Sequence, residues 1–170
     1  MNENYNAFDI SPVPPRGPSA VSPGVYRGIY GMPMFVTLPT RDLEASVDFW
    51  TRGLGFIDLF TIPGQLTHVR RWAFQDALLV PAGDAAAEGP GPMTVSFACI
   101  LAEIDGIAEA CAALDPKSVT GPRSTPWNTV DLEVTTPEKT RVIFTAGREL
   151  DPHSAQAEDL RSIGIDVPGR

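Results

Sequence analysis

The chain has 170 residues, of which 43% are hydrophobic and 20% are charged, a length that suits one compact domain or two small modules sharing a core. The formal net charge of -8 argues against nucleic acid as a partner, because phosphate binding needs a basic surface. Neither an apolar run of the roughly 18–20 residues that a membrane helix needs nor a signal-peptide pattern is present, so we expect a cytoplasmic protein with no membrane partner.

Residues 1–33 are predicted to form a Pro-rich N-terminal arm. Prolines such as Pro12, Pro14 and Pro15 forbid a regular helix or a central strand there. We expect this arm either to be disordered or to lie on a partner subunit as a dimer clasp.

The first ordered module is predicted over residues 34–81. A strand at 34–38 ends at Pro39, and Thr40 or Asp42 caps the helix that follows. Apolar residues recur at helical spacing until two glycines stop the helix. Three further strands are predicted, at 56–61, 66–73 and 77–81, the last two joined by a hairpin around residues 74–76.

A second module is predicted over residues 93–147, after an Ala-, Gly- and Pro-rich linker at 82–92. Its elements are a strand at 94–101, a helix at 105–114, a weak strand near 117–120, and a hairpin of strands at 127–134 and 140–145. A polar tail, 148–170, follows, with a short helix at 154–163.

The order of these elements is a repeat, βαβββ followed by βαβββ. Residues 35–48 superpose in pattern on 96–109, and residues 78–83 on 142–147. We therefore predict an α+β fold in which two βαβββ modules form curved mixed sheets around a cleft.

Period-2 alternation assigns one almost entirely apolar face of each sheet to the helices. The other face is mixed, as expected of a cleft where a few polar groups orient a ligand. It is predicted to carry Phe35, Thr37, Leu79, Ser96, Ala98, Thr129, Asp131, Glu133, Arg141, Ile143 and Thr145. The strand at 66–73 is ambiguous: either His68, Arg70 and Trp72 look into the cleft, which we favour, or Val69 and Arg71 do.

Residues 35–56, FVTLPTRDLEASVDFWTRGLGF, resemble the opening of the vicinal oxygen chelate superfamily, with its Asp-Leu helix start, Ser-x-x-Phe-Tyr/Trp core and Leu-Gly-Phe turn. A weaker match is VTTPEKTRVIF at 134–144, where the family has Asp-Pro-Asp-Gly before its last strand. The superfamily includes glyoxalase I, ring-cleaving dioxygenases, fosfomycin-resistance enzymes and bleomycin-binding resistance proteins. The resemblance covers roughly residues 34–147.

Enzymes of this superfamily hold one divalent metal with four inner-face His, Glu or Gln side chains. The resemblance carries those positions to Phe35, Leu79, Ser96 and Ile143. Three of these side chains cannot bind a metal, and a serine hydroxyl is a poor ligand. We therefore expect no metal and no cofactor, and the chain resembles the bleomycin-resistance branch.

This resemblance implies a homodimer that binds and sequesters a small hydrophobic or cationic molecule, such as an antibiotic, rather than an enzyme. The alternative is a lyase, isomerase or dioxygenase of the same superfamily that uses a metal or an improvised site. The remaining alternative is an accessory protein with no ligand of its own.

Several side chains are candidates for the ligand site. Asp131 and Glu133 either pair with a cationic group or lie at an exposed hairpin edge. Aromatic walls are expected from Trp127, Trp72 and Phe35, and also from Phe60, for which a core role is the favoured alternative.

The basic side chains leave alternatives of their own. His68 has no evident carboxylate partner, so a structural role is favoured over general-base catalysis. Arg70, Arg71 and Arg141 either bind an anion or, as we favour, balance Asp131 and Glu133.

Overall fold

The computed structural model describes residues 14–27, 35–72, 75–82 and 94–162. The first module contains β1 (Val36–Thr40), α2 (Leu43–Asp48), the π-helical segment η1 (Phe49–Gly53), β2 (Ile57–Ile62), β3 (Leu66–Arg71) and β4 (Gln75–Pro81). The second contains β5 (Thr94–Cys99), α3 (Leu101–Leu114), β6 (Val119–Ser124), β7 (Thr129–Thr135) and β8 (Arg141–Gly147), and α4 (Ala155–Ser162) follows it.

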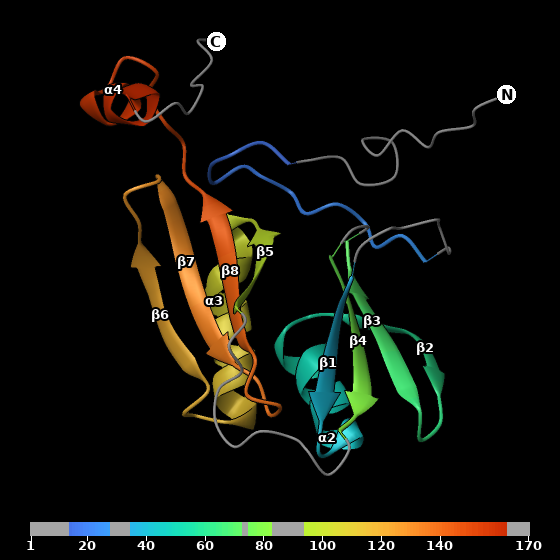
Figure 1. Cartoon of the computed structure of the whole chain (residues 1–170). Coiled ribbons are helices and arrows are strands. Elements are labelled where there is room, and N and C mark those ends of the chain that lie inside the picture. Colours follow the sequence, from blue (N-terminus) through green and yellow to red (C-terminus); the bar gives the residue numbers. More distant parts are fainter. Residues whose placement is uncertain (1–13, 28–34, 73–74, 83–93, 163–170) are drawn as a thin grey trace, which may run out of the picture.

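Each module forms its own four-stranded sheet, with strand orders β1-β4-β3-β2 and β5-β8-β7-β6 (Figure 1). In both sheets the first strand pairs in parallel with the last, and the remaining pairs are antiparallel. The predicted α+β fold with two βαβββ modules is confirmed. Most of the predicted linker, residues 83–92, lies outside the described residues.

Pro39 does not end the first strand, because β1 continues to Thr40. The strand lies at the edge of its sheet and pairs only with β4, and an edge position tolerates a residue without an N–H. Of the two predicted caps, Asp42 caps α2, since its Oδ1 accepts a hydrogen bond from the backbone N–H of Ala45 at 2.9 Å.

Helix α3 begins at Leu101, earlier than the predicted start at Asp105. The carboxylate of Glu103 accepts the backbone N–H of Ile100, so the first turn is capped by an acidic side chain three residues along. In the described part of the chain, no helix combines the length and the hydropathy that a membrane span requires.

The helices of both modules cover one face of each sheet and share a single hydrophobic core. Trp50 packs edge-on against Phe56, and Phe56 against Phe97, so the first module meets the second through aromatic rings. Both cysteines lie in this core, where burial raises the pKa of the Cys99 and Cys111 thiols to about 12. Neither thiol is therefore a nucleophile at neutral pH.

Segment η1 and helix α3 come together at Gly53. A Cβ at this position would lie 3.2 Å from Cys111 Sγ and 3.2 Å from Leu114 Cδ1. The missing side chain allows the two helical segments to pack closely.

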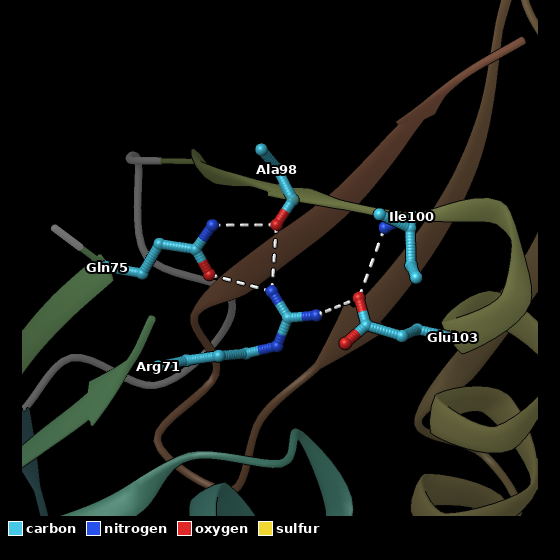
Figure 2. Close-up of polar contacts among 5 residues, drawn as sticks. All are labelled: Arg71, Gln75, Ala98, Ile100 and Glu103. Carbon is cyan, nitrogen blue, oxygen red and sulfur yellow. Dashed lines mark hydrogen bonds and ion pairs between the residues drawn. The ribbon is translucent and has the colours of Figure 1, made fainter. Parts of the chain in front are cut away.

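A buried arginine joins the modules on this helix-covered side. Arg71 ends β3, and its Nη1 donates to Gln75 Oε1 and to the carbonyl of Ala98, both at 2.8 Å. Its Nη2 donates to Glu103 at the start of α3 (Figure 2). The guanidinium also lies 5.3 Å from the ring centroid of Phe144, so it is held on several sides.

Glu138, in the turn between β7 and β8, makes the second polar junction. Its carboxylate accepts Trp50 Nε1 at 2.7 Å and Ser46 Oγ at 2.9 Å, both from the first module. We refer to the contacts of Arg71, Glu138 and Gly53 together as the junction.

The described part of the N-terminal arm, residues 14–27, packs on its own chain and crosses one end of both modules (Figure 1). The N–H of Gly17 donates to the carbonyl of Gly147, and Ala20 packs with Trp72 and Ile100. The carbonyl of Tyr26 accepts Arg70 Nη1 at 2.9 Å. This segment therefore contacts its own chain, whereas the sequence left open either disorder or contact with a partner subunit.

Candidate ligand-binding site

Each sheet has one face that the helices leave uncovered. On the first sheet the register places Thr37, Leu78 and His68 side by side on that face, with Arg70 beside Asp76. On the second it places Ser96, Ile143 and Glu133 side by side, with Ala98, Thr145 and Asp131 in the next row. We call these two surfaces the first and the second open face.

The prediction that Leu79 faces the cleft is wrong. Leu79 is fully buried in the shared core and pairs with Leu38, whereas Leu78 lies on the first open face opposite Thr37. Phe35, which precedes β1, shares the side of Thr37 through its ring contact with His68.

The register also corrects the overlay of the two modules. Burial along Val36–Thr40 follows the same order as burial along Val95–Cys99, so Thr37 is the counterpart of Ser96. Leu78 and Ile143 are the partners of these two residues in β4 and β8.

A divalent ion does not fit this set of side chains. Thr37, Leu78, Ser96 and Ile143 offer two hydroxyls and two hydrocarbon chains, and Phe35 adds only a ring, whereas a catalytic metal takes imidazole or carboxylate donors. Over the described ranges, no cluster of three or more His, Cys, Asp or Glu side chains could hold a metal ion.

The first open face is apolar and aromatic. Phe35 is 46% exposed, and Phe60 and Ile62 are each 40% exposed, so these large side chains remain in contact with solvent. The rings of Phe35 and Phe60 lie on His68, with centroid separations of 6.1 and 5.3 Å. Phe60 therefore belongs to this surface. The favoured prediction, that Phe60 lies in the core, is wrong.

A buried charged cluster lies beside these rings. Arg70 donates through Nε and Nη2 to the two carboxylate oxygens of Asp76, at 2.7 and 2.8 Å. His68 Nε2 lies 3.1 Å from Asp76 Oδ2. The favoured orientation of β3, with His68 and Arg70 on the uncovered side, agrees with the register, but Trp72 does not follow them.

The carboxylate partner of His68 was missed by the sequence reasoning. The hairpin was centred on residues 74–76, which put Asp76 in a turn, whereas Asp76 lies within β4 opposite Arg70. If residue 76 is assigned to the second strand of the hairpin, the polar residues at 68, 70 and 76 fall on one face of the sheet. That pattern would have identified Asp76 as the partner of His68.

Trp72 is buried at the junction instead of lining the open face. It occupies the tight turn after β3 with a positive φ of 57°, packs with Ala20 and Ile100, and lies under the guanidinium of Arg71, 4.7 Å from its ring centroid. Trp127, in the turn before β7, is 56% exposed.

The second open face is polar. Arg141 donates to both carboxylate oxygens of Glu133 at 2.6 Å, and this hydrogen bonding lowers the pKa of Glu133. Asp131 Oδ1 accepts from the hydroxyls of Thr129 and Thr145, each at 2.8 Å. Arg141 balances Glu133 as predicted, but Arg70 and Arg71 pair with Asp76 and Glu103 instead.

No family model and no curated protein sequence matches the chain. Solved structures do. A glyoxalase-related enzyme from Fulvimarina pelagi is 19% identical, with a TM-score of 0.56 over 68% of this chain and 88% of that one. The fosfomycin resistance protein FosX from Listeria monocytogenes, complexed with Mn(II), is 14% identical, with a TM-score of 0.56 over 70% and 92%. A bleomycin resistance determinant encoded on transposon Tn5 is 18% identical, with a TM-score of 0.51 over 69% and 98%.

Proposed function

Since the chain has the fold of the glyoxalase-related, fosfomycin-resistance and bleomycin-resistance proteins of the vicinal oxygen chelate superfamily, we propose that it binds and sequesters a small hydrophobic or cationic molecule without a metal ion. The predicted site residues retained in this proposal are Phe35, Thr37, His68, Arg70, Ser96, Trp127, Asp131, Glu133 and Ile143, with Leu78 in place of Leu79.

The observation that carries the proposal is the exposure of three large apolar side chains on one sheet face. Phe35, Phe60 and Ile62 are each 40% exposed or more, whereas large apolar side chains under the helices, such as Trp50, Leu79 and Phe144, are fully buried. A contiguous apolar surface bordered by polar groups is typical of a binding surface. Here it supports an aromatic or other hydrophobic ligand.

Asp131 supports the cationic part of the ligand. Its carboxylate receives two hydroxyl hydrogen bonds, which hold it in place without cancelling its charge. Glu133 is already neutralised by Arg141 and is the weaker candidate. Asp131 is therefore the proposed contact of a cationic group, and Trp127 is an exposed aromatic candidate in the turn before the same strand.

We further propose a cytoplasmic homodimer in which a second copy of the chain contributes to the ligand pocket. The exposed apolar surface of the first open face favours association with another chain. Sedimentation of the purified protein tests this directly, and a monomer at all concentrations would overturn it.

The binding test uses two probes in the presence of EDTA: copper-free bleomycin, which carries a cation and planar heteroaromatic rings, and naphthalene, which is flat and neutral. Calorimetry should show saturable binding of at least one probe. Truncating Trp127 to Ala should weaken bleomycin binding by roughly 1–4 kcal/mol if this side chain anchors the ligand. Asp131→Asn should weaken bleomycin binding and leave naphthalene binding unchanged.

The contrary outcomes are equally clear. Failure of both probes to saturate the EDTA-treated protein contradicts metal-free binding at the open faces. Binding that appears only after a divalent ion is added would favour the metal-dependent enzymes of this fold. Equal loss of both probes in Trp127→Ala and in the exposed control Arg52→Ala would show that Trp127 has no specific role.

A further inference from the structure

His68 is the only described residue with a buried side-chain nitrogen that lacks a hydrogen-bond partner. That atom is Nε2, which lies 3.1 Å from Asp76 Oδ2 but outside hydrogen-bond geometry. An unpartnered buried nitrogen is uncommon in a folded protein and calls for an explanation.

The carboxylate of Asp76 bears on which ring nitrogen of a neutral imidazole carries the proton. Its negative charge, 3.1 Å from Nε2, favours the tautomer with the proton on Nε2. Nδ1 is then the hydrogen-bond acceptor. Nδ1 makes no hydrogen bond in the described part of the chain and is not fully buried, so it is accessible to a donor.

Arg70 makes this arrangement rigid. It holds both oxygens of Asp76 and is itself anchored on the carbonyl of Tyr26, and both side chains of the pair are almost completely buried. Asp76 is therefore fixed beside His68 Nε2.

The rings of Phe35 and Phe60 flank the same imidazole and leave a large part of their surface exposed. The surroundings of His68 are therefore partly apolar and aromatic.

We propose that the first open face selects planar aromatic ligands that carry a hydroxyl group, such as phenols, by accepting the hydroxyl hydrogen at His68 Nδ1. Asp76 favours the tautomer that leaves Nδ1 as the acceptor. This inference rests on the proposed ligand-binding function and adds the chemical class of the ligand.

The test compares 2-naphthol with naphthalene, which differ only in the hydroxyl, by equilibrium dialysis with EDTA at about pH 8, where the free naphthol is protonated and a histidine side chain is ordinarily neutral. The wild-type protein should bind 2-naphthol about tenfold more tightly, as expected for one directed hydrogen bond.

His68→Phe keeps a flat ring and removes the acceptor, so it should erase the preference for 2-naphthol. Asp76→Asn should reduce the preference. The exposed His153→Phe serves as the matched control and should leave the preference unchanged.

Each result separates this inference from the proposed function. Equal binding of the two probes to the wild-type protein, or a preference that survives in His68→Phe, overturns the hydroxyl selection alone. Failure of both probes to bind overturns the binding function of this face as well. If Asp76→Asn does not fold, His68→Phe still decides the outcome.

Discussion

The junction and the open faces differ in where their polar side chains find partners. At the junction Arg71 and Glu138 each receive several partners from the other module, and Gly53 makes room for close packing. On the open faces, polar groups of one sheet pair within that sheet, as Arg70 does with Asp76 and Arg141 with Glu133.

We therefore assign the stability of the fold mainly to the junction and ligand recognition to the open faces. The two modules depend on one another through the junction, whereas each open face keeps its own chemistry, aromatic in the first module and polar in the second. Changes at the junction should therefore lower the free energy of unfolding and leave the probe selectivity of the folded protein intact. Changes on the open faces should do the reverse, unless they disturb a buried pair.

The largest effect is expected for Arg71→Ala. The substitution leaves Glu103 without its cationic partner and removes the link to Ala98, and breaking a buried ion pair costs about 3–5 kcal/mol. Urea unfolding measures the loss. Arg52→Ala, which removes an exposed helical pair with Asp48, should cost no more than about 0.5 kcal/mol. Equal losses in the two variants would contradict the importance of the junction.

Glu138→Ala should destabilise the fold by about 1–3 kcal/mol, because the indole N–H of the fully buried Trp50 loses its acceptor. Thermal unfolding followed by calorimetry provides the measurement. The control Glu109→Ala, on the exposed side of α3, should stay within about 0.5 kcal/mol of the wild type. A neutral Glu138→Ala would mean that the second polar contact of the junction is dispensable.

Two Gly→Ala substitutions in helical segments should change the free energy of unfolding in opposite directions. Gly53→Ala forces a methyl group against Cys111 and Leu114 and should cost about 1–3 kcal/mol. Gly106→Ala, in α3, meets nothing within 4 Å and should stabilise by roughly 0.5–1 kcal/mol through helix propensity. Chemical denaturation of both variants checks the prediction, and equal signs would refute the close packing at Gly53.

The smallest effect is a pH dependence on the second open face. Arg141 lowers the pKa of Glu133 in the folded state, so the pair stabilises the fold above the unfolded-state pKa and loses that contribution as the pH falls through the folded value. The difference in unfolding free energy between the wild type and Glu133→Gln should therefore shrink below pH 4.5, the ordinary value for this carboxyl.

High salt should reduce the same difference, because Arg141 is exposed. If the difference in unfolding free energy between the wild type and Glu133→Gln stays constant from neutral to acidic pH, at either salt concentration, the ion pair with Arg141 does not stabilise the fold.

The repeat and the two sheets could be predicted because each element has its own hydrophobic periodicity and is bounded by capping residues, glycines or prolines. The helix start at Asp42 and the strands of the second module follow from such local signals. The face of β4 could not, because residues 77–80 are all apolar and show no alternation. The predicted orientation of Leu79 was wrong for that reason.

The charged part of the candidate site depends on pairings that no local pattern records. His68 meets Asp76 only through the register of β3 and β4, and Arg71 meets Glu103 only through the packing of one module on the other. Sequence reasoning identified His68 and Arg70 as candidates but could not supply their partner.

The segment 14–27 touches the end of β8 at Gly147, the junction at Trp72 and the charged cluster at Arg70. It therefore links the beginning of the chain to both halves of the molecule at once. Proteolytic cleavage within this segment would release an anchor of Arg70 and uncover Trp72 together. Limited digestion is thus a way to alter the aromatic surface without mutating any residue on it.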